Sequence, residues 1–321
     1  LPQMLHMSLC GLPFIHSDAG GFAQGTKDEE LYTRWLQMSC FSPILRPHGS
    51  GIPSEPVYFN DTTQKIVRSF MNLRYQLLPY IYTLTYEANT EGVPIIRPLF
   101  YEFPEDSVTY DIVNEYMFGE SILVAPVIEK DQEVMSVYLP EGVNWYNFWD
   151  HSRYNGGQWI DIEISLETIP VFIKAGSFIP MVAPVKSTVD YSSEKVTVRY
   201  YINETESYNT GLMYEDDGET FRSPPEDTGY EVLSFNAISA EKSEIFIFES
   251  NDDNALLNFT ERMINFEIIG LESMNFKTVQ LEDAFGINSI IGQKKNLDTV
   301  NWYLKNDEVN TLNIKFDWEV N

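Results

Sequence analysis

The chain has 321 residues, of which 43% are hydrophobic and 21% are charged, so it is long enough for two or three domains that each bury a core. It carries 48 acidic against 21 basic residues, and the formal net charge of −27 disfavours nucleic acid and anionic membrane surfaces as partners. The negative electrostatic field of such a chain is compatible with a neutral ligand. Aromatic residues make up 14% of the chain, which suits β-rich cores as well as aromatic walls of binding sites.

The two cysteines, Cys10 and Cys40, form no CxxC pair, so the sequence predicts neither a zinc cage nor a disulfide framework. A bridge between them is geometrically conceivable, but we expect two buried free thiols. We expect no metal and no organic cofactor. The first residues lack a basic segment followed by a long apolar one, so we do not expect a signal peptide. No apolar stretch of about 18 residues predicts a membrane span, and the compartment stays open.

The first part of the chain, residues 1–104, has the pattern of an α/β domain. The apolar run Leu12–Ser17 lies between glycine-containing segments, which predicts a buried parallel strand. Thr26 and Glu29 then form a capping-box pattern. Apolar residues at helical spacing follow and predict a helix over residues 28–39.

A second pair of elements repeats this order. The run Ser42–Arg46 predicts a strand, and apolar residues spaced three and four apart predict a long helix over residues 61–90. Asp61 is the expected N-cap, and Pro79 is expected to kink the helix. Two βα units cannot close a (β/α)8 barrel. Either the chain is a piece of a longer one, whose missing strands would lie N-terminal to Leu1, or these units pack on something else.

The pattern changes near residue 105, where short apolar or alternating runs separated by turn dipeptides begin. The expected strands include Ile122–Ile128, Ser136–Leu139, Trp145–Phe148, Pro170–Ile173, Phe178–Met181, Val196–Ile202, Leu212–Glu215, Ser243–Glu249 and Glu267–Gly270. This spacing predicts antiparallel β-sandwiches. With a boundary inside 183–193, we expect domains at 1–104, 105–185 and 186–321.

Functional groups in parallel α/β folds lie just beyond the carboxyl ends of strands. Asp18 and His48 follow the two predicted strands, and Phe22 closes a Gly-Gly turn next to Asp18. A carboxylate, a histidine and an aromatic wall would together suit a monosaccharide. The residues alone leave other interpretations open, because Asp18 suits an Asx-turn, His48 an ordinary loop and Arg46 an ion pair with a buried carboxylate.

The acidic run Glu215-Asp216-Asp217-Gly218 also has two interpretations. Three acids before a glycine suggest calcium, but their spacing differs from that of a calcium-binding loop. A hairpin turn with Asp-Gly at its tip fits the run better.

Several ordered motifs resemble glycoside hydrolase family 31. The run GLPFIHSDAGGF and then DEELYTRWLQMSCFSPILRPH resemble the end of that family's catalytic barrel. Further similar runs are LRYQLLPYIYTL at 73–84, PIIRPLFYEFP at 94–104, GESILVAPV at 119–127, YLPEGVNWYNFW at 138–149, IPVFIKAGSFIPM at 169–181 and LMYEDDGETF at 212–221. The resemblance covers residues 1 to about 225 and implies the end of a (β/α)8 barrel followed by two β-sandwich domains.

The resemblance also implies roles for individual residues. Asp18 and His48 would contact the sugar in subsite −1, Phe22 would be an apolar contact there, and Arg46 matches the arginine of the motif. The family's catalytic acids, an aspartate nucleophile in a W-x-D-M-N-like motif and an aspartate acid/base in a G-D-N-like motif, have no counterpart in this sequence. We expect both upstream of Leu1, so this chain alone should not turn over.

The activity implied is that of a retaining exo-α-glycosidase, and α-glucosidase is the leading hypothesis. Its expected partners are an α-glycoside or oligosaccharide and the N-terminal remainder of the enzyme. Rivals within the family are α-xylosidase, α-galactosidase and sulfoquinovosidase. The rival of another class is a non-catalytic carbohydrate-binding or structural module.

Overall fold

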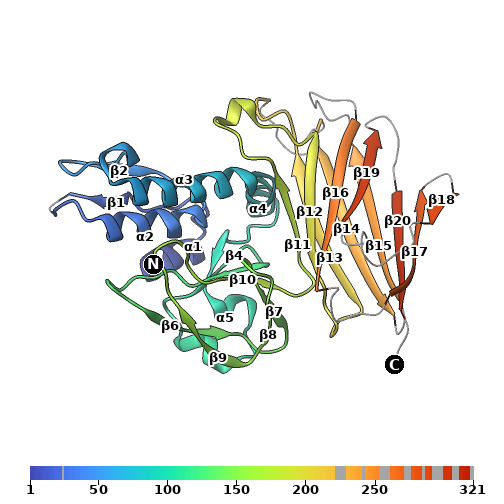
Figure 1. The fold of residues 1–321 in the computed structure, drawn as a ribbon, viewed down its shortest axis with the longest axis horizontal. Helices are drawn as coiled ribbons and strands as arrows, with labels where there is room; N and C mark the ends of the chain where they lie inside the picture. Colours follow the sequence, from blue (N-terminus) through green and yellow to red (C-terminus); the bar gives the residue numbers. More distant parts are fainter. Residues whose placement is uncertain are drawn as a thin grey trace. The chain divides into compact units, whose positions relative to one another are not determined.

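The computed structural model describes residues 1–23, 25–220, 229–240, 243–252, 261–270, 276–283, 286–290, 299–305 and 311–318. The chain divides into two compact units (Figure 1). Unit 1 comprises Leu1–Gln76 and Leu84–Lys174, and unit 2 comprises Leu77–Thr83 and Ala175–Asn321. Within the described ranges, no helix has both the length and the apolar character that crossing a bilayer would require. The proposed division into three domains stays a prediction.

The helices and short 3-10 turns fall mostly in the first third of the chain. They are α1 (Pro2–Leu9), α2 (Glu29–Cys40), η1 (Pro56–Tyr58), α3 (Asp61–Gln76), α4 (Leu78–Thr90), α5 (Leu99–Glu102), η2 (Ser107–Asp111) and η3 (Thr188–Asp190). The prediction of a helix over 28–39 is confirmed, but its N-cap is wrong. Asp28, rather than Thr26, caps α2, because its Oδ1 accepts hydrogen bonds from the backbone N–H groups of Glu30 and Leu31.

The long helix predicted over 61–90 is two helices, α3 and α4, that meet at Leu77. Pro79 explains the break, since it has no N–H to donate to the carbonyl of Tyr75 and its ring would collide with that carbonyl in a continuous helix. The expected N-cap is also one residue off. The cap of α3 is Asn60, whose Oδ1 accepts from the N–H of Thr63 at 2.8 Å.

The first two strands lie later in the chain than predicted. Residues 12–17 and 42–46 are not strands, whereas β1 (Ala19–Phe22) and β2 (Pro47–Gly49) are a parallel pair. One reason is that Arg74 binds the carbonyl oxygens of Cys40, Ser42 and Pro43, so these carbonyls face a guanidinium instead of a neighbouring strand. A partly buried arginine therefore occupies acceptors that a strand ladder would use.

The remaining strands of unit 1 form antiparallel sheets. One sheet has the order β3-β4-β5-β10-β7-β8 and the other pairs β6 with β9. Their bounds are β3 (Ile96–Arg97), β4 (Tyr116–Phe118), β5 (Ile122–Val124), β6 (Val134–Leu139), β7 (Asn144–Asn147), β8 (Arg153–Asn155), β9 (Gln158–Glu163) and β10 (Val171–Lys174). The strands predicted at 122–128, 136–139, 145–148 and 170–173 are confirmed in kind, with shifted ends.

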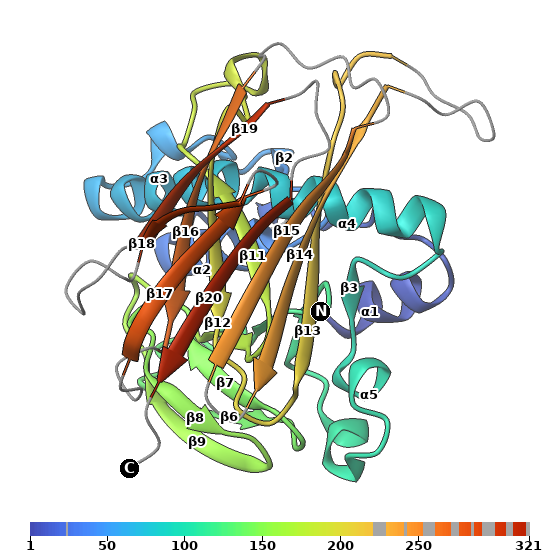
Figure 2. The same cartoon turned by 90° about the vertical axis from the view of Figure 1, so that its right-hand side faces the viewer.

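Unit 2 contains two sheets that share one hydrophobic core. One has the order β11-β12-β16-β19 and the other β13-β14-β15-β20-β17-β18, and the second can be followed strand by strand in Figure 2. Their bounds are β11 (Phe178–Val182), β12 (Lys195–Tyr201), β13 (Tyr208–Glu215), β14 (Glu231–Ala240), β15 (Ser243–Asp252), β16 (Glu261–Ile269), β17 (Phe276–Asp283), β18 (Gly286–Ile290), β19 (Thr299–Lys305) and β20 (Thr311–Trp318). Neighbouring strands are antiparallel except β12 and β16, which are parallel and differ from the prediction.

The core of unit 2 is aromatic. Phe178 of β11 and Phe266 of β16 pack against Phe235 of β14 and Phe248 of β15, so residues from both sheets meet in one cluster. The alternation of buried and exposed residues along these strands places every second side chain in this cluster. The aromatic residues of these strands are thus used for packing.

A buried ion pair accompanies this core. Arg262 of β16 is fully buried and bonds to the carboxylate of Glu231 and to the backbone and hydroxyl of Ser193. Nearby, burial raises the pKa of Glu215 to about 7 against the opposing effect of Arg262. Such a pair fixes the register of its strands, because each partner would be costly to bury alone.

The acidic run after β13 is not the tip of a two-residue hairpin, because β14 begins only at Glu231. Asp216 instead accepts hydrogen bonds from the hydroxyls of Tyr82 and Tyr214 and from the N–H of Gly218. Asp217 likewise caps the following backbone N–H groups. These carboxylates therefore stabilise the chain's exit from β13.

The two cysteines differ from one another. Cys40 is buried, as predicted, and its Sγ lies 3.2 Å from the carbonyl oxygen of Phe70. Cys10 is exposed, so the expectation of two buried thiols is wrong. It follows α1, a helix that the sequence did not predict, and this helix ends at the surface.

Candidate functional site

The parallel pair β1 and β2 brings the four predicted site residues onto two neighbouring segments of unit 1 (Figure 1). The N–H of Ala19 donates to the carbonyl oxygen of Arg46 at 3.1 Å, and the N–H of Ser50 donates to that of Phe22 at 2.7 Å. Asp18 therefore immediately precedes one strand, whereas His48 lies within the other. Both had been expected just beyond strand ends, and the shifted strands account for the difference.

Asp18 carries the most unusual polar atom of this region. Its Oδ1 lies 3.7 Å from the guanidinium of Arg46 and 4.0 Å from Nδ1 of His16. Both distances exceed a hydrogen bond, and this buried oxygen has no hydrogen-bond partner among the described residues. The side chain as a whole is 31% exposed. A carboxylate oxygen that lies near a guanidinium and an imidazole but is hydrogen-bonded to neither can accept a hydrogen bond from a hydroxyl of a ligand.

His48 and Phe22 form the second pair of the site. Their ring centroids lie 5.3 Å apart with an interplanar angle of 32°. Phe22 is 42% exposed and adopts a φ of +46°, which is rare for a bulky residue and costs about 1–3 kcal/mol. The chain thus holds an aromatic ring out toward solvent beside an imidazole, an arrangement typical of ligand contacts rather than of a core.

At two glycines of this region, Gly20 and Gly49, neighbouring protein groups leave no room for a side chain. A Cβ on Gly20, whose φ is +105°, would lie 2.8 Å from the ring of Tyr32. A Cβ on Gly49 would lie 2.2 Å from the carbonyl oxygen of Ile52. Tyr32 is itself fully buried and donates its hydroxyl to the carbonyl of Ser54. The glycines therefore let α2 and the loop after β2 approach the site closely.

Two residues near the site were not identified from the sequence. His16 faces Asp18, and the indole Nε1 of Trp35 donates to the hydroxyl of Ser17 at 2.7 Å, which anchors the segment before β1 to α2. The signal for His16 was present, because residues two apart in an extended segment point to the same side. The contact of Trp35 joins two elements and had no signal in the local sequence.

A buried acid lies elsewhere in unit 1. Glu115 is fully buried, its Oε1 accepts from the N–H of Tyr138 at 2.9 Å, and burial raises its pKa to about 8. Its Oε2 has no hydrogen-bond partner in the described part of the chain. Among the described residues, no group of three or more His, Cys, Asp or Glu could hold a metal ion.

Two family models match this chain. Residues 1–84 match the TIM-barrel domain of glycosyl hydrolases family 31, and residues 92–179 match the C-terminal domain of the same family. The match to the barrel model includes all four residues around β1 and β2. The β-rich part of unit 1 falls almost entirely in the second match.

The chain is also similar to individual curated proteins. It is 39% identical over 223 residues to alpha-glucosidase 2 of Bacillus thermoamyloliquefaciens, an alignment that covers 69% of this chain and 28% of that protein. It is 35% identical over 225 residues to the alpha-xylosidase of Saccharolobus solfataricus, covering 69% of this chain and 30% of that protein. The chain thus spans less than a third of the length of these relatives.

Solved structures share the fold over nearly the whole chain. The glucose complex of a Flavobacterium johnsoniae GH31 dextranase superposes with a TM-score of 0.82 at 27% identity, over 98% of this chain and 41% of that one. A Xanthomonas citri GH31 alpha-xylosidase gives a TM-score of 0.75 at 26% identity, over 94% of this chain and 33% of that one.

Proposed function

The chain belongs to glycosyl hydrolase family 31, and from this premise we propose that it is the C-terminal region of a retaining exo-α-glycosidase acting on terminal α-linked sugars. α-Glucosides are the proposed substrates, in line with the alpha-glucosidase at 39% identity. The family's relatives at this similarity are glycoside hydrolases. The alignments cover less than a third of the length of these relatives, so their activities do not establish the substrate or partners of this chain. Both are proposed from the residues of its own site.

The observation that carries the proposal is an acceptor oxygen on Asp18 to which no described residue donates a hydrogen bond. Its buried Oδ1 lies between the guanidinium of Arg46 and the imidazole of His16 without a hydrogen bond to either. A sugar hydroxyl donated to this oxygen would satisfy it. In this proposal His48 donates to a second hydroxyl, Phe22 covers an apolar face of the ring, and Arg46 holds the carboxylate of Asp18 in place.

We further propose that the two catalytic carboxylates lie outside residues 1–321. A retaining mechanism needs two carboxyl groups about 5–5.5 Å apart, one to attack the anomeric carbon and one to protonate the leaving oxygen. Neither acid motif of the family occurs in this sequence. The role of Asp18 is therefore binding and orientation, and hydrolysis requires the remainder of the enzyme.

The architecture follows from the same inference. Residues 1–104 are proposed to complete a (β/α)8 barrel, 105–185 a proximal β-sandwich and 186–321 a distal one. The antiparallel sheets of both units and the core that the two sheets of unit 2 share support this arrangement.

The test is hydrolysis of nitrophenyl α-glucoside by the complete gene product carrying Asp18→Ala. Loss of hydrogen bonds to a charged acceptor should lower kcat/KM about 10- to 100-fold. Asp190→Ala, which removes an exposed carboxylate in unit 2, is the matched control and should leave kcat/KM unchanged. Wild-type kcat/KM in the Asp18 variant would refute the assignment.

A second candidate within the family is α-xylosidase activity, which the relative at 35% identity supports. A panel of nitrophenyl α-glucoside, α-xyloside and α-galactoside decides between these substrates. If the complete gene product binds these sugars and hydrolyses none, it is a non-catalytic module and the enzymatic proposal is wrong.

A further inference from the structure

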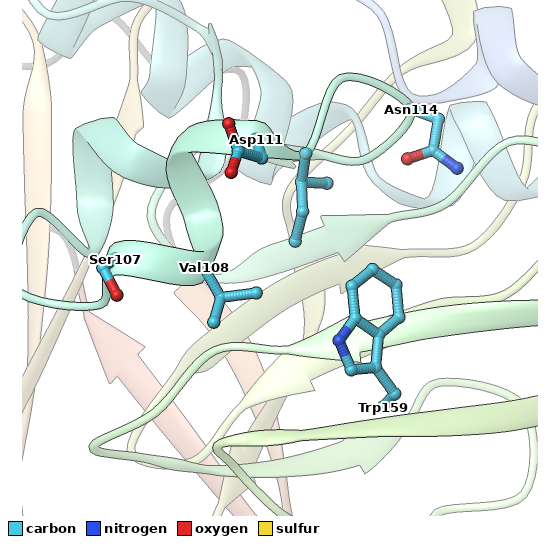
Figure 3. A pocket seen from close by; sticks show the side chains of 6 residues that line it. Ser107, Val108, Asp111, Asn114 and Trp159 are labelled. Atoms are coloured by element: carbon cyan, nitrogen blue, oxygen red, sulfur yellow. The ribbon is translucent and has the colours of Figure 1, made fainter.

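A pocket in unit 1 lies between η2 and β9. It has a volume of about 440 Å³ and is lined by Ser107, Val108, Asp111, Ile112, Asn114 and Trp159 (Figure 3). Pockets for small molecules span roughly 300–1,000 Å³, so its size suits one or two sugar units. None of these residues belongs to the site around Asp18.

Trp159 forms one side of this pocket. Trp159 is 52% exposed as a residue, whereas tryptophan is highly buried on average. It stands opposite Tyr138 in the β6–β9 pair, with ring centroids 5.2 Å apart, so the second ring supports it from behind. Figure 3 shows the indole directed from β9 toward the segment that carries Asp111 and Asn114. The indole thus presents its surface to the pocket.

Asp106 fixes both sides of the pocket relative to one another. Its Oδ1 accepts from the N–H of Val108 and caps η2, while its Oδ2 accepts from the hydroxyl of Tyr138 at 2.7 Å and the N–H of Glu141 at 2.9 Å. Asp106 is buried. One carboxylate therefore joins the helical side of the pocket to the residue behind Trp159, so the pocket is formed before any ligand binds.

The polar groups of the pocket are uncommitted. The side chains of Ser107, Asp111 and Asn114 make no hydrogen bond to any other described residue. Together they offer a carboxylate acceptor, an amide that both donates and accepts, and a hydroxyl that does both. Neighbouring hydroxyls of a sugar also donate and accept, and the C–H face of its ring suits an indole.

Other ligand chemistries fit less well. The carboxylate of Asp111 and the net charge of −27 oppose an anion. An organic cation would be attracted to Trp159 and Asp111, but cages for such cations use several aromatic walls, and the apolar remainder of this pocket is Val108 and Ile112.

We propose that this pocket is a second sugar-binding site that takes a neutral oligosaccharide, with one ring stacked on Trp159 and its hydroxyls bonded to Asp111 and Asn114. The choice of an α-glucan as its ligand rests on the proposed function of the chain. The site would hold a longer substrate chain on the enzyme between cleavage events.

The test is isothermal titration of the full chain with maltoheptaose, in an Asp18→Ala background that disables the first site. Binding should persist in this background. Adding Trp159→Ala should lower the association constant about tenfold or more, and Asp111→Ala about three- to tenfold. Trp159→Phe should restore most of the binding. Tyr58→Ala, which removes an aromatic ring that is 60% exposed elsewhere in unit 1, should leave it unchanged.

Three outcomes would overturn the proposal: no binding of maltoheptaose in the Asp18→Ala background, equal binding with and without Trp159, or binding of choline in place of the sugar. Circular dichroism of each variant shows whether it is folded. If Trp159→Ala does not fold, the association constant of Trp159→Phe is compared with that of the chain that retains Trp159. Failure of the proposed function has a separate signature. Unimpaired hydrolysis by the Asp18→Ala variant would refute the proposed role of Asp18. A loss of maltoheptaose binding in the Trp159→Ala variant would still support the second site.

Discussion

Glu115 makes the stability of unit 1 depend on pH in a way that one substitution should remove. Its carboxyl is fully buried, one oxygen accepts from the N–H of Tyr138, and burial raises its pKa from the ordinary 4.5 to about 8. Glu115→Gln keeps the shape and an acceptor for that N–H but does not titrate. Comparing the two proteins across pH therefore isolates this carboxyl.

The sign and size of the effect follow from proton linkage. Below pH 4.5 the carboxyl is protonated in the folded and unfolded chain, and its ionisation does not affect stability. Between pH 4.5 and about 8 only the unfolded chain loses the proton, so the free energy of unfolding falls by about 1.4 kcal/mol per pH unit. The full loss, complete above about pH 8, is about 5 kcal/mol.

The assay is urea unfolding at pH 5, 6, 7 and 8, with hydrogen exchange of the β6 amides as a local measure. The free energy of unfolding of the native protein minus that of Glu115→Gln should fall by about 4 kcal/mol from pH 5 to pH 8. Glu133→Gln, which alters an exposed carboxyl just before β6, should retain the native pH dependence. If native protein and Glu115→Gln lose stability in parallel, the carboxyl is ionised in the fold and the reasoning is wrong.

Three further predictions concern other parts of the chain. Ellman's reagent should label one thiol in the native chain and two in urea, because Cys10 is exposed and burial raises the pKa of Cys40 to about 12; labelling of both in the native state would contradict the fold. Arg262→Met should lower the free energy of unfolding by about 3–5 kcal/mol in urea titrations, because Glu231 would lose its buried partner; a loss below about 1 kcal/mol would count against this pair. Gly20→Ala should lower Tm more than Gly21→Ala, since both residues have φ near +105° but only the first methyl meets a tyrosine ring at 2.8 Å; equal Tm values would show that the ring moves aside.

Local sequence signals predicted the elements well where a periodic pattern was long. Helix α2 and the strands predicted at 136–139, 170–173 and 196–202 are present with ends shifted by one or two residues, because helix and strand periods place apolar residues on one face. The proline at 79 was expected to kink a helix and instead separates two. A proline lacks the backbone N–H whatever its surroundings, so the sequence alone predicts that the helix is disturbed at this position.

Contacts between distant residues decided what the local pattern could not. The guanidinium of Arg74 donates hydrogen bonds to the carbonyl oxygens of Ser42 and Pro43, so these oxygens do not pair with a neighbouring strand. No feature of the run 42–46 predicts this contact. The parallel pairing of β12 with β16 depends on which strands become neighbours after β13, β14 and β15 have formed the other sheet. Strand pairing is set by partners far along the chain, so it cannot be read from one segment.

The amino-acid sequence by itself determined the family and the identity of the candidate sugar-binding residues, because their motifs are continuous runs of the chain. Only the tertiary structure showed that an oxygen of Asp18 near Arg46 and His16 has no hydrogen bond to any described residue. It also showed that Trp159 lies beside polar side chains, from a segment some fifty residues earlier, that bond to no other described residue. The physical reason is that hydrogen-bond satisfaction and exposure are properties of surroundings. Those surroundings exist only once distant segments have packed together.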